Sequence, residues 1–192
     1  VVPDEISGHL FLFSEYIAEP RFGSQLAGCD LGIDEALGLG YLVARQIAEL
    51  HERGMAHNNV NAGALLFRGD PETRLLYPSM IGLVDPSLEP AAMAADVRSL
   101  AALTISWLQP HRALAMPAAA RARIDGLRAR LDSAATDARH PPPPVAELSV
   151  MLSDAIAGLD YNFSVLRDAG GDLVEYLRLV VSHKLFGRLW GA

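Results

Sequence analysis

The chain has 192 residues, of which 51% are hydrophobic and 20% charged, and it carries a formal net charge of −7 at pH 7. A chain of this length and hydrophobicity can bury one sizeable core. The acidic balance disfavours general binding to nucleic acid, which requires clustered Lys and Arg to displace counterions from phosphates. We therefore expect a globular domain without a nucleic-acid partner.

Further features of the composition bear on where the chain works. No run approaches the roughly 18 to 20 uncharged apolar residues that cross a bilayer, so we expect no membrane insertion of this chain. The single cysteine, Cys29, permits no internal disulfide, which is compatible with a cytoplasmic location. Arginine far outnumbers lysine and alanine is frequent, as in GC-rich bacteria. Because a strand-like run follows Val1 almost at once, we expect a fragment of a longer protein.

The first part of the chain predicts one strand and one long helix. Residues 9–17 form a run rich in Leu, Phe, Tyr and Ile that is typical of a buried strand. Asp34 and Glu35 then open a helix, and Gly54 is the residue type that commonly follows a helix end. Apolar residues fall on one face of this helix at Val43, Ile47 and Leu50.

Short strands are predicted after this helix. Two apolar runs, 64–67 and 80–84, are separated by a polar turn at 68–72 and by residues 75–77. Runs of this length fit small strands or hairpins, and we expect such elements here.

The second half of the chain predicts helices. Apolar residues recur there at helical spacing in four segments, which are 91–110 (ended by Pro110), 118–131, 145–156 and 172–190. Pro141 to Pro144 form an extended spacer before the third segment. Few short strands followed by several helices predict an α+β fold that is mainly α-helical.

Several segments resemble, in the same order, segments of protein Ser/Thr kinases. The most specific is 47–57, which is similar to the helix and turn that lead into the kinase catalytic loop. The others are Phe13 to Ile17 for the hinge between the lobes, Leu83-Val84-Asp85 for the metal-binding turn, Asp96 to Leu100 for the central buried helix, and Arg139-His140-Pro141 with 145–148 near the end of the lobe. The chain thus resembles a bacterial protein Ser/Thr kinase from the hinge onward.

The resemblance implies a division of the chain. Residues 1–158 would form a kinase-like C-terminal lobe, and residues 159–192 would add a C-terminal helical extension. The N-terminal lobe is largely absent, because neither a glycine-rich phosphate loop nor a strand with the phosphate-binding lysine precedes the hinge.

The kinase positions that carry phosphate transfer are degenerate in this chain. In the family the loop reads His-Arg-Asp, with a lysine two residues later and a metal-binding asparagine five residues later. The resemblance puts Asn59, Asn61 and Ala64 at those positions, and neither an amide nor a methyl group can replace the lost chemistry. It implies no catalytic residue, a structural role for His57, and a role for Asp96 in anchoring the loop backbone.

The resemblance also implies that no cofactor binds. Asp85 keeps the aspartate of the metal-binding turn and is the residual candidate for a metal ligand, although we expect no metal. Glu15, Tyr16 and Ile17 match the hinge that would hold an adenine, but without the upper lobe the nucleotide pocket is half built.

The sequence therefore favours a catalytically inactive pseudokinase module that acts as a protein-interaction scaffold or allosteric regulator within a larger protein or complex. Its expected partner is another protein or an upstream domain that covers the side of the missing lobe. Four apolar residues near the end of the chain either pack back on the lobe or form a partner site, namely Leu185, Phe186, Leu189 and Trp190. Two alternatives stay open, a divergent phosphotransferase of the small-molecule-kinase type and a nucleotide-sensing domain without turnover.

Overall fold

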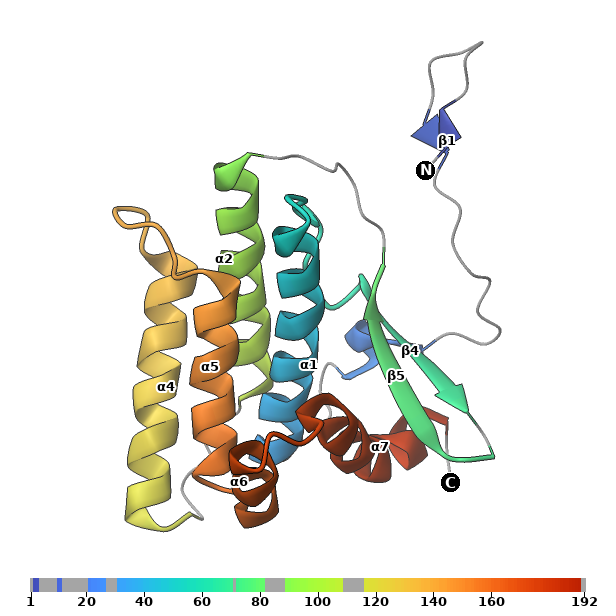
Figure 1. Ribbon diagram of the computed structural model, residues 1–192, viewed down its shortest axis with the longest axis vertical. Helices are drawn as coiled ribbons and strands as arrows, with labels where there is room; N and C mark the ends of the chain where they lie inside the picture. The colour runs from blue at the N-terminus through green and yellow to red at the C-terminus, as the bar shows by residue number, and fades with distance from the viewer. Residues whose placement is uncertain are drawn as a thin grey trace.

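The computed structural model describes residues 2–3, 10–11, 21–26, 31–70, 72–81, 89–108 and 116–190 (Figure 1). Its helices are α1 (Ile33–Glu52), α2 (Pro90–Trp107), α4 (Ala118–Thr136), α5 (Val145–Ala157), α6 (Tyr161–Asp168) and α7 (Leu173–Trp190), with a short 3-10 helix η1 (Gly23–Leu26). Its strands are β1 (Val2–Pro3), β2 (Leu10–Phe11), β3 (Arg21–Phe22), β4 (Leu65–Asp70) and β5 (Leu75–Met80). The predicted α+β, mainly helical class is confirmed. Of the strand expected over 9–17, only β2 lies within the described residues.

Helix α1 begins and ends where the sequence predicts. At its start, the backbone N–H of Gly32 donates to the Glu35 carboxylate over 2.6 Å, and the acidic Asp34 and Glu35 suit the positive end of the helix dipole. Past its end, Gly54 adopts a φ of 74° and donates its N–H to the carbonyl of His51. Glycine reaches this left-handed conformation without a steric penalty, so it ends the helix.

The second β-strand after α1 includes residues that the sequence analysis placed between two apolar runs. Of the run 80–84, only residues 80 and 81 lie within the described part of the chain. Strand β5 covers residues 75–80 and pairs antiparallel with β4, with Leu75 opposite Asp70 and Met80 opposite Leu65. Residues 75–77 are therefore part of a strand, and they lie opposite the polar residues 68–70. Alternate residues of a strand point to opposite faces of the sheet. Leu76 therefore points to the core and is buried, whereas Leu75 and Tyr77 point the other way and are half-buried.

The outer edge of β5 is closed by side chains from two helices. Gln46 of α1 donates its side-chain amide to the carbonyl of Pro78 over 2.7 Å and accepts the N–H of Met80 over 2.9 Å. Ser182 of α7 accepts the N–H of Leu76 over 2.7 Å. Buried backbone groups that face away from β4 thus find partners without another strand. The sheet order β3-β4-β5 ends at this edge.

Helices α2, α4 and α5 stand beside α1 and form the helical side of the molecule (Figure 1). Pro90 occupies the first turn of α2, where its missing N–H costs nothing, and Pro117 and Pro144 directly precede α4 and α5. These helices bury one face each, through residues that include Leu100, Ile124, Leu131, Leu148 and Leu152. All of them belong to one hydrophobic core.

Helix α6 was not predicted from the sequence. Asp160 caps it, because its carboxylate accepts the N–H of Phe163 over 3.1 Å. Phe163 is fully buried, with its ring edge-on to Tyr41 at a centroid distance of 6.4 Å. Asp160 also accepts the hydroxyl of Tyr176, and burial together with this bond raises the pKa of Tyr176 to about 12. One carboxylate therefore links the start of α6 to α7.

Helix α7 lies alongside the β4–β5 hairpin and packs on α1 (Figure 1). Leu177, Val181 and Leu185 are buried and belong to the same core as the residues of α1 and β4. Gly38 of α1 lies so close to α7 that a Cβ there would come within 2.9 Å of Val181. Residues 159–190 thus share the core of the preceding chain. No helix of the described part is both long and apolar enough to cross a bilayer.

Candidate functional site

The connection between α1 and β4, residues 57–64 (the 57–64 loop), is fixed by one buried carboxylate. Asp96 of α2 accepts the backbone N–H of His57 over 2.6 Å and that of Asn58 over 2.8 Å. The Nε2 of His51, on α1, lies 3.1 Å from the same carboxylate. Asp96 is 2% exposed, and a buried carboxylate requires such donors to offset its lost hydration. It therefore ties α1, α2 and the loop together.

The backbone of the 57–64 loop turns sharply at Asn58. This residue has a φ of 58°, in the left-handed region that asparagine adopts more readily than most other residues with a Cβ. The conformation aims two successive N–H groups, those of His57 and Asn58, at one carboxylate. Asp96 thus holds a backbone conformation that costs energy by itself.

The side chains of the loop are occupied with the loop's own structure. The Asn61 amide donates to the Asn59 side-chain oxygen over 2.6 Å and to the Asn59 carbonyl over 3.2 Å. Its oxygen accepts the N–H groups of Gly63 and Ala64. Ala64 is buried and leads into β4. The structure thus brings Asn59, Asn61 and Ala64 into one turn, in which neutral amides hydrogen-bond to the backbone and neither can act as a proton acceptor.

His57 lies beneath this loop with its ring enclosed. It is 2% exposed, and among the described residues neither ring nitrogen has a hydrogen-bond partner. Burial lowers the pKa of His57 below its usual value, while the Asp96 carboxylate and the nearby Met80 backbone offset part of that effect. The neutral ring therefore fits a packing role better than a role in proton transfer.

The hinge residues Glu15, Tyr16 and Ile17 and the candidate metal ligand Asp85 lie outside the described residues. Within the described ranges no group of three or more His, Cys, Asp and Glu side chains could hold a metal ion.

The four apolar residues near the end of the chain lie against the hairpin. Leu185, Phe186 and Leu189 are buried, and Trp190 is half-buried with its ring stacked on Phe186 at a centroid distance of 5.1 Å. The Trp190 ring covers Gly69 of β4 so closely that a Cβ there would lie 2.6 Å from it. These contacts correspond to the first of the two expected alternatives, in which the residues pack back on the domain.

Arginines cover the aromatic rings of this region, and sequence reasoning did not anticipate them. Arg68 and Arg178 both lie over Tyr77, each with Cζ 5.0 Å from the ring centroid. Arg74 lies 5.5 Å from Phe186, and Arg21 lies 5.6 Å from Trp190. We call this set the arginine–aromatic face. Contacts of this kind keep guanidinium groups at the surface in fixed positions.

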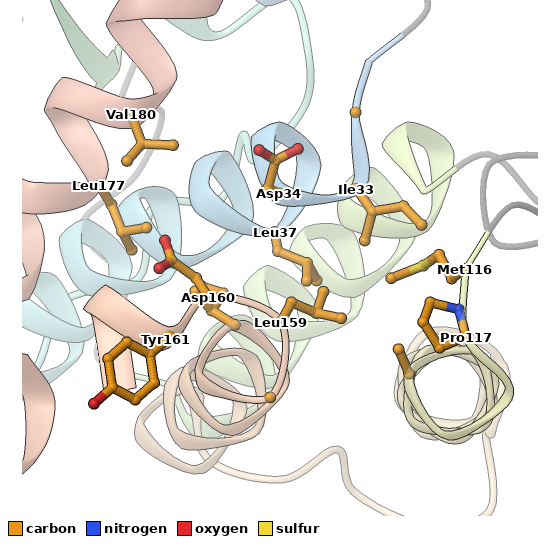
Figure 2. A pocket seen from close by; sticks show the side chains of 14 residues that line it. Ile33, Asp34, Leu37, Met116, Pro117, Leu159, Asp160, Tyr161, Leu177 and Val180 are labelled. Atoms are coloured by element: carbon orange, nitrogen blue, oxygen red, sulfur yellow. The ribbon is translucent and has the colours of Figure 1, made fainter. Parts of the chain in front are cut away.

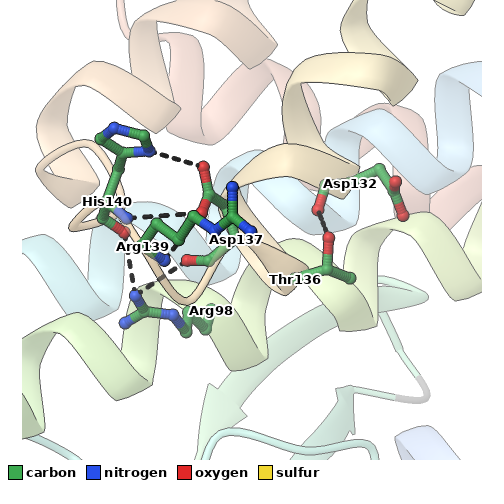
Figure 3. Close-up of polar contacts among 6 residues, drawn as sticks. All are labelled: Arg98, Asp132, Thr136, Asp137, Arg139 and His140. Carbon is green, nitrogen blue, oxygen red and sulfur yellow. Dashed lines mark hydrogen bonds and ion pairs between the residues drawn. The ribbon is translucent and has the colours of Figure 1, made fainter.

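The connection between α4 and α5 is held to α2 by Arg98 (Figure 3). Its guanidinium donates to the carbonyls of Asp137 and His140 over 3.2 and 3.1 Å. The Asp137 carboxylate accepts from the His140 ring and from the N–H groups of Arg139 and His140. The hydrogen bond from the His140 ring is the main cause that lowers the pKa of Asp137. This segment is thus a rigid turn that precedes the extended prolines.

A pocket of about 650 Å³ opens at the start of α1, between α4, α7 and the turn before α6 (Figure 2). Its walls are mainly apolar, with Leu37, Met116 and Leu159 among them. Its two carboxylates are both engaged, because Asp160 caps α6 and Asp34 pairs with Lys184. None of the residues singled out from the sequence as site candidates lines it.

Comparison of the chain with protein-family models, with curated proteins and with solved structures found no match.

Proposed function

We propose that the protein is a catalytically inactive, kinase-like module that works as a protein-interaction scaffold or allosteric regulator. The observation that carries the proposal is the Asp96 anchor. A buried carboxylate supports two successive N–H groups of a loop whose outward side chains are the neutral amides of Asn58, Asn59 and Asn61. Such a loop keeps a defined backbone shape but has no group that could activate a hydroxyl.

The order of elements supports the kinase-like part of the proposal. A long helix, an anchored loop, a hairpin and then a buried helix that supplies the anchor follow each other as the resemblance implies. The proposed lobe begins at the hinge, so its upper side would be covered by another protein or by an upstream domain.

The surface beside the 57–64 loop supports the interaction role. Ile81 directly follows β5, donates its N–H to the carbonyl of Ala64, and is 37% exposed. The exposed Asn58, Asn61 and Gly63 lie in the same loop. A rigid polar loop next to an exposed isoleucine combines an apolar anchor with hydrogen-bonding groups, as protein interfaces do.

The experiment that tests inactivity is incubation of the purified chain with labelled ATP, magnesium and generic protein and small-molecule acceptors. We expect no transfer above a protein-free control. Transfer that is lost in Asp85→Ala would overturn the proposal and favour the divergent phosphotransferase. A magnesium-dependent rise in melting temperature with ATP, also lost in Asp85→Ala, would instead favour a nucleotide sensor.

The interaction role is tested by site-specific photo-crosslinking in cells that produce the protein. A crosslinking residue at position 81 should give a discrete protein adduct, whereas one at Asp125, an exposed position of α4, should not. Equal labelling from both positions would contradict an interface beside the loop.

A further inference from the structure

A second pocket, of about 350 Å³, lies between the turn of the β4–β5 hairpin and α7. It is separate from the 57–64 loop. Its walls combine three polar groups that carry hydrogen-bond donors with an apolar side formed by Leu75, Leu179 and Phe186. The three polar residues are Arg74, Ser182 and His183. Thr73 lines it too, but its hydroxyl donates to the Asp70 carboxylate over 2.7 Å.

Arg74 presents its guanidinium to this pocket. The residue is exposed, and its guanidinium has no ion pair or hydrogen bond with any described residue. Its position is nevertheless defined, because the group lies over the Phe186 ring, which forms part of the pocket wall. A guanidinium held on an aromatic ring keeps its N–H donors directed outward to an anion.

The backbone at Arg74 is unusual for an arginine. Its φ is 56°, in the left-handed region that glycine prefers at a hairpin turn. Arginine occupies this position although glycine would relieve the strain. Strained residues of this kind are enriched at ligand sites.

Ser182 and His183 add two more donors from α7. Ser182 is 1% exposed, and its oxygen accepts the N–H of Leu76, so its own proton stays available for another acceptor. His183 is exposed, and no hydrogen bond or ion pair joins its ring to the part of the chain that the structure describes. Of the two acidic residues in the hairpin turn, Asp70 accepts hydrogen bonds from the turn itself, and the exposed Glu72 does not line the pocket.

We infer that this pocket binds a small organic anion, with its phosphate or carboxylate group on Arg74, Ser182 and His183 and its apolar part against Leu75 and Leu179. The volume lies at the lower end of the range for ligand sites, which suits a group the size of a substituted benzene ring. Phosphate monoesters and carboxylates share the required chemistry, and the experiment separates them.

The experiment is titration of the whole chain, by calorimetry and NMR, with four probes. The probes are phenyl phosphate, benzoate, inorganic phosphate and benzyl alcohol. We expect phenyl phosphate or benzoate to bind at least about tenfold more tightly than inorganic phosphate and benzyl alcohol, since only the first two offer both an anion and an apolar part. Equal binding of all four probes, or of none, would overturn the inference.

Matched variants locate the binding site. Arg74→Gly removes the guanidinium at a φ that glycine tolerates, so the protein should fold and lose about tenfold or more in affinity. His183→Gln should weaken binding less. Arg130→Gln, at an exposed position of α4 on the opposite side of the molecule, should leave it unchanged. Wild-type affinity in Arg74→Gly with a normal melting temperature would refute the assignment.

Discussion

The 57–64 loop and the arginine–aromatic face are held by different forces, although both lie next to the same hairpin. In the loop, one buried carboxylate receives two backbone N–H groups, so its order depends on charge-assisted hydrogen bonds in a dry environment. On the arginine–aromatic face, guanidinium groups lie over rings at the surface, where each contact contributes about 0.5–1 kcal/mol. Removal of the Asp96 carboxylate should therefore destabilise the 57–64 loop strongly. The arginine–aromatic face should tolerate the substitution of any single arginine.

The largest expected effect is that of Asp96→Ala. It leaves the N–H groups of His57 and Asn58 without their acceptor, and it also removes the partner of His51. We expect a loss of about 3–5 kcal/mol in the free energy of unfolding, measured by urea denaturation. Asp132→Ala, at an exposed position of α4, should change it by less than about 0.5 kcal/mol. Similar losses in both variants would contradict the anchor.

A smaller loss is expected where α7 meets the hairpin. Gly69→Val inserts atoms where a Cβ would already lie 2.6 Å from the Trp190 ring, so the ring must move. We expect about 1–3 kcal/mol of destabilisation and a changed near-UV circular dichroism spectrum. A Cβ added at Gly126 would meet no neighbouring side chain within 4 Å, so Gly126→Ala in α4 should stabilise by about 0.5–1 kcal/mol. A neutral Gly69→Val would mean that Trp190 does not cover β4.

The closed edge of β5 should give a still smaller effect. Gln46→Ala removes two hydrogen bonds to the backbone of β5, at Pro78 and Met80. We expect a loss of about 1–2 kcal/mol and faster hydrogen exchange at Met80. Glu49→Ala, exposed on the same helix, serves as the control. Unchanged exchange at Met80 in Gln46→Ala would show that the edge is protected by another contact.

The smallest expected effect is the loss of stability when the pH is lowered. Burial lowers the pKa of His57, so the unfolded chain binds a proton more readily than the folded chain. The stability contributed by the neutral ring is present above about pH 6.5 and is lost as the pH falls below that value. The free energy of unfolding should therefore fall more steeply with acidification in the wild type than in His57→Leu. Parallel pH profiles would contradict a buried neutral histidine.

Much of the helical part of this fold could be predicted from the sequence, because each helix carries its own signals. Asp34 and Gly54 mark the ends of α1, and apolar spacing marks α2, α4, α5 and α7. Helix α6 was missed although Asp160 is a typical capping residue, because a single cap without a long apolar pattern is a weak signal. The pairing of residues 75–77 was not expected, because their partners are the polar residues 68–70, which look like a turn on their own.

Some residues of the candidate sites could be expected from the sequence to lie together, and others could not. Asn59, Asn61 and Ala64 lie in one short stretch of sequence, and only the resemblance led us to expect that Asp96 would meet them. Arg74 and His183 are more than a hundred residues apart, and neither has a signal that points to the other. Only the packing of α7 on the hairpin brings them to one pocket.

The side chains that close the outer edge of β5 have a consequence for association with other chains. An exposed strand edge can pair with a peptide or with a second sheet and so extend the sheet from one molecule to the next. Gln46 and Ser182 already occupy three backbone groups of this edge, the carbonyl of Pro78 and the N–H groups of Leu76 and Met80, and Pro78 has no N–H to offer. Pairing of another strand with β5 would first have to break these hydrogen bonds, so we expect this edge to resist extension of the sheet.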